Sequence, residues 1–377
     1  METINRALLP KLRERMFRGK AIILVGARQV GKTTLFRKVC SESGMKYAEF
    51  SCDSPEIRRL LKDIPENEIP LLTGDNRIIM IDEAQRVENI GLTIKRLVEQ
   101  YPDRQFLVTG SSSLHLRSNI NEPLTGRKFE YELFPISTDE LLVSDGLVNT
   151  RDMLERRLIF GSYPEIVTHP GDALELLSGI AGSYLYKDIL NLEGIRRPVL
   201  LEKLLIALAL QVGSEVSYNE LAQTVGSDPK TVEKYVDLLE KSYVVKILNG
   251  LSRNLRNELK KGKKIYFYDT GIRNAILHNF SPVEVRTDIG SLWKNFFIME
   301  RMKYNAYRGA HQNYYFWRST AQQEVDFIEE RDGEMLLFEM KWNPKKSNVR
   351  FPRAFIEAYP VGETAVITPE NYIDWLR

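Results

Sequence analysis

The sequence predicts an α/β protein that begins with a parallel, three-layer domain. Four short apolar runs have the length of buried strands, and three stretches of helical spacing alternate with them. This alternation is typical of strand–helix–strand units, in which helices cover both faces of a parallel sheet. The expected strands are residues 21–25, 46–50, 77–81 and 105–109, and the expected helices are 33–43, 54–63 and 90–101. We expect this domain to end near residue 140.

Composition limits the remaining possibilities. The 377 residues suffice for two or three domains, and 43% hydrophobic with 28% charged residues is an ordinary globular balance. Cys40 and Cys52 have no metal-ligand spacing and no disulfide framework, which predicts a reducing, cytoplasmic location. The N-terminus lacks a signal peptide and no run of 18 apolar residues occurs, so we expect no membrane contact. The net charge of +2 does not indicate nucleic acid, so any such contact must come from local clusters.

A glycine-rich loop follows the first expected strand and reads Gly-Ala-Arg-Gln-Val-Gly-Lys-Thr-Thr. Glycines at these positions let backbone N–H groups surround a β-phosphate, Lys32 can reach the β- and γ-oxygens, and the Thr33 hydroxyl can ligate magnesium. The following helix directs its positive end at the phosphates. The loop therefore predicts binding of a nucleoside triphosphate. The predicted nucleotide-binding residues are Gly26, Ala27, Arg28, Gln29, Val30, Gly31, Lys32, Thr33 and Thr34.

The third expected strand ends in two acids, Asp82 and Glu83. A central parallel strand delivers such side chains to the carboxyl edge of the sheet. There Asp82 would hold the magnesium through water, and Glu83 would polarise the attacking water. A buried strand that ends in a solvated acidic turn gives the same letters, but the loop at residues 26–34 favours the catalytic interpretation.

Two further residues are candidates for the same site. Ser111 follows the fourth expected strand and could sense the γ-phosphate or orient the water, although a hydroxyl-rich turn that caps a helix is the alternative. Arg127 follows a glycine turn and precedes a strand-like run at 129–133. Ring-forming ATPases insert such an arginine into a neighbour's site, but an ordinary surface arginine has the same pattern.

The middle of the chain changes character. Residues 150–205 have helical spacing that is interrupted at 161–165, and we expect a small helical lid here. The following segment, up to residue 268, has the layout of a winged helix-turn-helix. Its first helix is expected at 218–225 behind a capping box, its second runs to Lys241, and two strands flank a basic loop.

The basic loop is the predicted DNA contact, because six cations with a single acid, Glu258, suit a phosphate backbone. The second helix is mixed in charge, so docking to a protein remains the alternative. The predicted DNA-binding residues are Arg253, Arg256, Lys260, Lys261, Lys263 and Lys264.

The last third of the chain alternates charged and apolar residues along expected strands. A helix at 292–304 carries Glu300, and strands follow at 314–317, 324–328 and 335–341. Asp326 and Glu339 could hold a divalent metal, with Glu300 as a further ligand, while Lys341 could assist a hydroxide that attacks phosphate. A surface hairpin with charged residues at alternate positions is the other interpretation.

Taken together, these motifs resemble the prokaryotic ATPases of the AAA+ superfamily in which an ATPase core precedes a winged helix and a restriction-endonuclease-like domain. The resemblance implies ATP and Mg²⁺ as cofactors, Lys32, Thr33, Asp82 and Glu83 in the roles given, Ser111 as sensor and Arg127 as the finger. It divides the chain into an ATPase core (1–140), a helical lid (141–205), a winged helix (206–270) and a nuclease-like domain (271–377). The motifs that carry it are residues 26–34, 81–85, 109–111, 124–127, 161–165, 268–271 and 324–327.

The C-terminal domain resembles nucleases that use an Asp followed by Glu-x-Lys, here Asp326, Glu339 and Lys341. Two positions depart from that pattern. Val325 replaces a proline that supplies no ligand, whereas Lys294 stands where relatives often carry an acid, which weakens the metal site. Catalysis by this domain therefore rests on fold-level analogy.

Three functions compete at this point. The leading hypothesis is an ATP-driven protein that forms a homo-oligomeric ring and engages duplex or branched DNA. The second is an ATP-gated docking or signalling module without DNA activity. The third is a metal-dependent nuclease that ATP regulates.

Overall fold

The computed structural model describes residues 4–62, 64–110, 124–185, 197–252 and 262–377. Its contacts divide the chain into two compact units. The first comprises residues 1–135 with 241–243, and the second comprises 136–240 and 244–377. The four-domain division expected from the sequence stays a prediction. Within the described residues, no helix has both the length and the apolar character that crossing a membrane requires.

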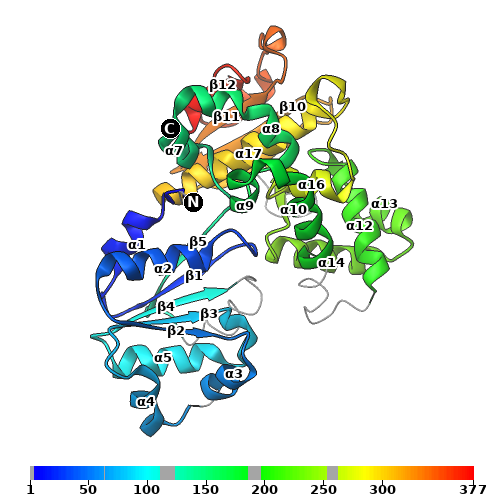
Figure 1. Ribbon diagram of the computed structural model, residues 1–377. Helices are drawn as coiled ribbons and strands as arrows, with labels where there is room; N and C mark the ends of the chain where they lie inside the picture. The colour runs from blue at the N-terminus through cyan, green and yellow to red at the C-terminus, as the bar shows by residue number, and fades with distance from the viewer. Residues whose placement is uncertain (1–3, 63, 111–123, 186–196, 253–261) are drawn as a thin grey trace. The chain divides into compact units, whose positions relative to one another are not determined.

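The first unit is a parallel sheet between two helical layers, as the alternating pattern predicts. Its strand order is β2-β3-β4-β1-β5, and the registers of all four strand pairs are parallel. Helices α1 and α2 lie on one face, and α3 and α5 on the other (Figure 1). The strands are β1 (Ala21–Val25), β2 (Tyr47–Ser51), β3 (Ile78–Asp82), β4 (Gln105–Gly110) and β5 (Lys128–Glu132), and the helices are α1 (Leu9–Arg15), α2 (Lys32–Ser43), α3 (Pro55–Lys62), α4 (Ile69–Thr73) and α5 (Ile90–Gln100).

The apolar composition of the central strands explains their buried positions in the sheet. All five side chains of β1 are buried, as are those at 78–81 of β3, because helices cover both faces of the sheet. Strands that are apolar on both faces suit such positions, and β-branched residues favour the extended backbone. The carboxyl ends of β1, β3 and β4 therefore meet at one edge of the sheet.

The second unit combines a helical segment with a seven-stranded mixed sheet of order β12-β11-β10-β9-β7-β8-β6. Its helices are α7 (Thr138–Asp152), α8 (Leu154–Phe160), α9 (Pro164–Thr168), α10 (Ala173–Gly179), α12 (Pro198–Leu210), α13 (Tyr218–Val225), α14 (Pro229–Lys241), α16 (Thr270–Ile276), α17 (Ile289–Arg308) and α18 (Arg353–Ile356). Its strands are β6 (Glu215–Val216), β7 (Val245–Gly250), β8 (Lys263–Phe267), β9 (Asn313–Arg318), β10 (Glu324–Arg331), β11 (Glu334–Met340) and β12 (Val361–Ile367).

The sheet continues across the boundary expected at residue 270. Strand β7 pairs with β8 in an antiparallel hairpin and with β9 in parallel, and Leu251 N–H donates to the carbonyl of Phe316 at 2.7 Å. An apolar cluster packs where the hairpin meets the C-terminal strands. In this cluster Leu251 contacts Val325, Ile328 and Phe355. The hairpin and the C-terminal strands are thus parts of one sheet.

Two motifs more than a hundred residues apart form one clamp in the second unit. The Asp269 carboxylate accepts the Ser162 N–H at 2.7 Å through one oxygen, and caps α16 by accepting the N–H groups of Gly271 (2.9 Å) and Ile272 (3.2 Å) through the other. The Thr270 hydroxyl donates to the carbonyl of Arg157 at 2.9 Å. The motifs at 161–165 and 268–271 therefore fix α16 against α8.

The clamp explains both of its glycines. A Cβ on Gly161 would lie 1.9 Å from Asp269 Oδ1, and Gly161 also has a positive φ of 75°. A Cβ on Gly271 would lie 2.1 Å from the carbonyl oxygen of Phe160. Only glycine fits where backbone and carboxylate approach this closely.

We predict that Gly271→Ala lowers the free energy of unfolding by about 1–3 kcal/mol, because the added methyl group must displace backbone atoms. The matched control is Gly290→Ala in α17, where a Cβ would meet nothing within 4 Å. Denaturant unfolding followed by circular dichroism measures both variants. Equal stability of the two variants would show that the clamp does not require glycine.

Candidate functional site

The glycine-rich loop connects β1 to α2 with backbone angles and close contacts that require glycine. Gly26 has a φ of 147°, and a Cβ there would lie 2.2 Å from the carbonyl oxygen of Leu133. Gly31 precedes α2 with a φ of 92°, and Gln29 also has a positive φ, of 61°. The N-terminal N–H groups of α2 thus face the loop, which is the geometry that binds phosphate.

The ammonium group of Lys32 lies inside the loop. The side chain is buried, and its Nζ donates to the carbonyls of Gly26 at 3.0 Å and Ala27 at 2.7 Å. A cation held among loop carbonyls is positioned for the charge of a phosphate group.

Sequence reasoning missed one support of this loop. Arg6 is buried and donates to the carbonyls of Val30 and Phe134, each at 2.6 Å. It therefore fastens the loop to the segment that follows β5. No local pattern distinguishes Arg6 from the other cations near the N-terminus, since its partners are 24 and 128 residues away.

Asp82 and Thr33, which the sequence assigned to one magnesium ion, are in direct contact. The Thr33 hydroxyl donates to Asp82 Oδ1 at 2.8 Å. The Thr109 hydroxyl donates to the same oxygen at 2.5 Å. Carboxylate and hydroxyl oxygens at the end of a phosphate-binding loop are the donors that Mg²⁺ uses in such sites, so these residues fit the ion.

Glu83 is held in an unusual conformation beside this pair. Its φ is 54°, which is uncommon for a residue with a side chain. Its N–H donates to the Thr109 hydroxyl at 3.0 Å, and its Oε2 accepts from Gln85 at 2.5 Å. Thr109 therefore joins Asp82 to Glu83, a role that sequence reasoning did not give it. A hydroxyl at the end of a strand adjacent to an acidic pair was the available signal.

Two candidates for this site remain, and the structure describes Arg127 but not Ser111. Arg127 forms an ion pair with Glu99, with 2.7 Å between Nε and Oε1, and both side chains are 42% exposed. Ser111 lies outside the described residues. The structure therefore shows Arg127 at the surface of the first unit.

The predicted DNA contacts of the basic loop need a correction. Lys264 is only 2% exposed, pairs with Glu324 and lies over the ring of Phe316, so it is part of the core of the sheet. Lys263 is half-buried and contacts Glu233 at 3.5 Å. The other four predicted residues, Arg253, Arg256, Lys260 and Lys261, lie outside the described residues.

The nuclease-like carboxylates are neutralised by lysines. Asp326 is buried, and its two oxygens accept from the Lys294 ammonium and from the Met340 N–H at 3.1 Å. Glu339 accepts from Lys341 at 2.8 Å. Burial alone would lower the pKa of Lys294, but the carboxylates of Asp326, Glu339 and Glu324 together outweigh that effect and the pKa is raised. The ammonium group thus stays charged.

Glu300 was predicted as a further metal ligand, and the structure assigns it elsewhere. It is 3% exposed, and its two oxygens accept from the Thr138 N–H and from Lys303 Nζ, each at 2.6 Å. Among the residues that the structure describes, no group of three or more His, Cys, Asp or Glu side chains could hold a metal ion. The donor set around Asp326 therefore does not fit a divalent cation.

The geometry of the first unit defines a P-loop nucleotide-binding domain. Comparison with known proteins agrees: residues 18–142 match the family described as "AAA domain". Residues 18–142 thus have the fold of an AAA+ P-loop domain. Residues 151–283 and 289–376 match two families described as domains of unknown function (DUF8612 and DUF4143).

Two relatives that match over two thirds or more of this chain are uncharacterized proteins. An uncharacterized protein of Mycobacterium tuberculosis is 29% identical over 375 residues, which cover 98% of this chain and 80% of the relative. An uncharacterized protein of Haemophilus influenzae is 24% identical over 278 residues, which cover 67% of this chain and 68% of the relative.

Solved structures are similar only at a low level. The RuvB Holliday junction branch migration motor of Thermotoga maritima is 17% identical, with a TM-score of 0.36, and the match covers 74% of this chain and 96% of RuvB. Domain III of the Thermotoga maritima replication initiation protein DnaA is 14% identical, with a TM-score of 0.32 over 60% of this chain and 93% of that domain.

We predict that the C-terminal metal position is empty in the wild type and can be opened by Lys294→Glu, because a carboxylate would then replace the ammonium group beside Asp326. Thermal melts without nucleotide, with and without Mn²⁺, measure this in a Thr33→Ala background, which removes one of the two proposed ligands of the metal site in the first unit. Mn²⁺ should raise the Tm of the Lys294→Glu protein and leave the parent and a Lys294→Gln control unchanged. A Mn²⁺-dependent rise in the parent would contradict the assignment.

Proposed function

We propose that the first unit binds ATP with Mg²⁺ and hydrolyses it. The contact that carries this proposal is the link from Asp82 through Thr109 to Glu83. It holds an ion-binding carboxylate and a candidate base at the edge of the sheet where the glycine-rich loop ends. Such a pair behind a phosphate-binding loop suits hydrolysis rather than storage of a nucleotide.

Each residue has one task in this proposal. Lys32 and the N–H groups of the loop bind the phosphates. Thr33 and Asp82 supply oxygens to the magnesium ion, which neutralises charge on the phosphates. Glu83 accepts the hydrogen bond of the attacking water. Gln85 and Thr109 fix the position of Glu83 through hydrogen bonds. Ser111 remains the proposed sensor.

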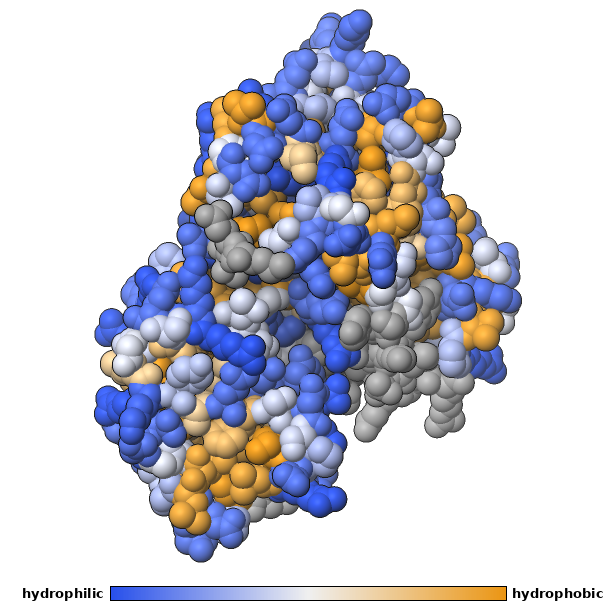
Figure 2. Space-filling view, viewed as in Figure 1, coloured by the Kyte–Doolittle hydropathy of each residue, from blue (hydrophilic) through white to orange (hydrophobic). Residues whose placement is uncertain are grey.

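We propose that Arg127 completes the site of a neighbouring copy in a ring. The arginine is half-exposed and its partner Glu99 is equally exposed, so exchange of this surface pair for another partner costs little. The first unit also exposes Leu71 of α4 and Leu92 of α5, and apolar side chains gather over these helices (Figure 2). Exposed apolar patches are typical of protein contacts.

We propose duplex or branched DNA as the partner of the second unit. The order of α13 and α14 followed by the hairpin of β7 and β8 suits a winged helix, and the basic residues between these strands suit a phosphate backbone. The buried position of Lys264 and the mixed charge of α14 favour the alternative, a protein-docking module. The neutralised carboxylates at Asp326 and Glu339 argue against a nuclease.

We predict that Glu83→Gln lowers the kcat of ATP hydrolysis by about 10²–10⁴-fold while ATP still binds, because the amide cannot take up a proton. Glu88→Gln is the matched control, since its exposed carboxylate pairs with Lys62 outside the site. Phosphate release and fluorescent ATP binding report the two properties. Normal hydrolysis by Glu83→Gln would remove the assignment of the base.

We predict that Arg127→Ala and Glu83→Gln are each inactive alone but recover activity when mixed, because Arg127 of one copy can serve the intact site of another. Random mixing in equal amounts should restore about a quarter of the wild-type rate if each site needs one neighbour. The control Glu99→Gln should keep its activity. An active Arg127→Ala protein would exclude the finger.

A further inference from the structure

A basic segment follows the last strand of the nuclease-like motif. Residues 341–353 read Lys-Trp-Asn-Pro-Lys-Lys-Ser-Asn-Val-Arg-Phe-Pro-Arg, with five cations and no acid. Lys341 pairs with Glu339. The other four cations, Lys345, Lys346, Arg350 and Arg353, are exposed.

These four cations differ from most others in the second unit. Lys263, Lys264, Lys294, Arg301 and Lys303 each pair with a carboxylate. Within the described part of the chain, the side chains of the four exposed cations have no hydrogen bond or ion pair. Their charge is therefore available to a partner.

The backbone of the segment is held at both ends. At its start, Lys341 N–H donates to the carbonyl of Ile367 at 2.9 Å, and the Asn343 side chain accepts the Lys345 N–H at 3.0 Å. At its end, Phe351 and Phe355 pack into the apolar cluster around Leu251. The cations are displayed from an anchored segment, which lowers the entropy lost when a partner binds.

The spacing of the cations suits a long polyanion. The eight residue steps from 345 to 353 span at most about 28 Å. Duplex DNA presents a phosphate about every 3.4 Å along each strand, so several phosphates lie within that reach. A membrane surface fits less well, because Phe351 packs against the apolar cluster and every apolar side chain of the segment is at least partly buried.

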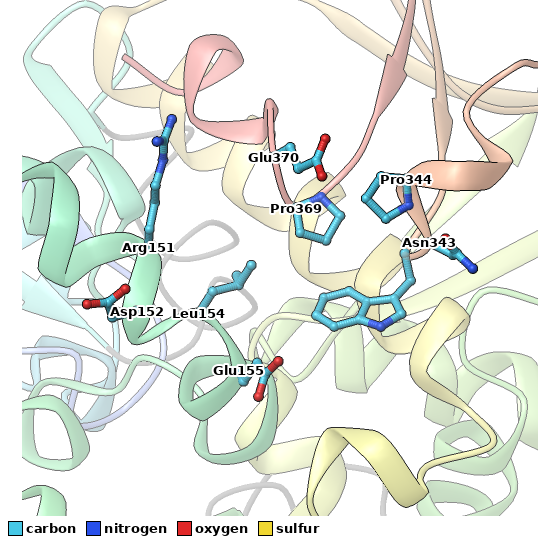
Figure 3. Close-up of a pocket in the computed structure, with 9 residues that line it drawn as sticks. Arg151, Asp152, Leu154, Glu155, Asn343, Pro344, Pro369 and Glu370 are labelled. Atoms are coloured by element: carbon cyan, nitrogen blue, oxygen red, sulfur yellow. The ribbon is translucent and has the colours of Figure 1, made fainter.

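Charges beside the segment limit where the polyanion can lie. A pocket next to its first residues is lined by Trp342 and Pro344 together with three acids, Asp152, Glu155 and Glu370, and one cation, Arg151 (Figure 3). The excess of acid repels phosphate from the pocket. Contact is thereby confined to the stretch from Lys345 to Arg353.

We propose that the basic segment 341–353 binds the phosphate backbone of duplex DNA through Lys345, Lys346, Arg350 and Arg353. This inference rests on the proposed DNA function and names the surface that carries it. The contact is independent of sequence, because cations on phosphates position DNA without reading bases.

The test compares two variants of the full chain with equal loss of charge. In the first, Lys345, Lys346, Arg350 and Arg353 are each changed to Gln. In the control, four other exposed cations outside the proposed winged helix, Arg18, Arg59, Lys203 and Arg331, are each changed to Gln. Fluorescence anisotropy with a labelled random 25-base-pair duplex gives Kd between 50 and 200 mM salt, and melts confirm that both variants fold.

The first variant should bind at least about tenfold more weakly than the wild type at low salt, and the slope of log K against log salt should fall by about 3–4. The control should lose clearly less. Equal loss in both variants, or none in the first, overturns the surface while the proposed DNA function stands. Wild-type protein that shows no salt-sensitive DNA binding overturns the DNA function itself. Loss of binding to phosphatidylserine vesicles with DNA binding intact would assign the surface to a membrane and overturn the proposal.

Discussion

The first unit depends on one carboxylate oxygen, Asp82 Oδ1. It accepts hydrogen bonds from Thr33 on α2 and Thr109 on β4, so a single atom joins three elements at the carboxyl edge of the sheet. Hydrogen bonds to a carboxylate are stronger than neutral ones, and they hold the loop, the ion-binding residues and Glu83 in register. The same acid that would serve the magnesium ion therefore organises the site before any nucleotide binds.

The second unit has an analogous centre in Asp269. Burial raises the pKa of this carboxyl because it disfavours the charged form. Hydrogen bonds from three backbone N–H groups oppose this rise by stabilising the carboxylate. The clamp joins the helical segment that contains α8 to helix α16, at the start of the C-terminal part. A buried carboxylate that accepts hydrogen bonds from both segments opposes their separation.

The sequence predicts the elements well wherever a local pattern exists. Apolar runs located β1 to β4, and the glycine-rich motif located the loop between β1 and α2. Strand β12 was missed because it lies at the sheet edge and its apolar pattern is interrupted by the exposed residues Gly362, Glu363 and Thr364. Arg6, Lys264 and Lys294 could not be placed, since each acquires its role from a partner 24 or more residues away. Local spacing in the sequence shows which helix, strand or loop carries a charged side chain. It does not show which distant group neutralises that charge.

The most direct test of the account is the rate of ATP hydrolysis by Thr109→Val, with Thr109→Ser as its control. Valine keeps the shape of the side chain but removes the hydroxyl that joins Asp82 to Glu83, whereas serine keeps it. The account predicts that the valine variant binds ATP but hydrolyses it at least about tenfold more slowly, the cost of one lost positioning contact of about 1.4 kcal/mol, while the serine variant stays close to the wild type. Hydrolysis by the valine variant at the wild-type rate would contradict it.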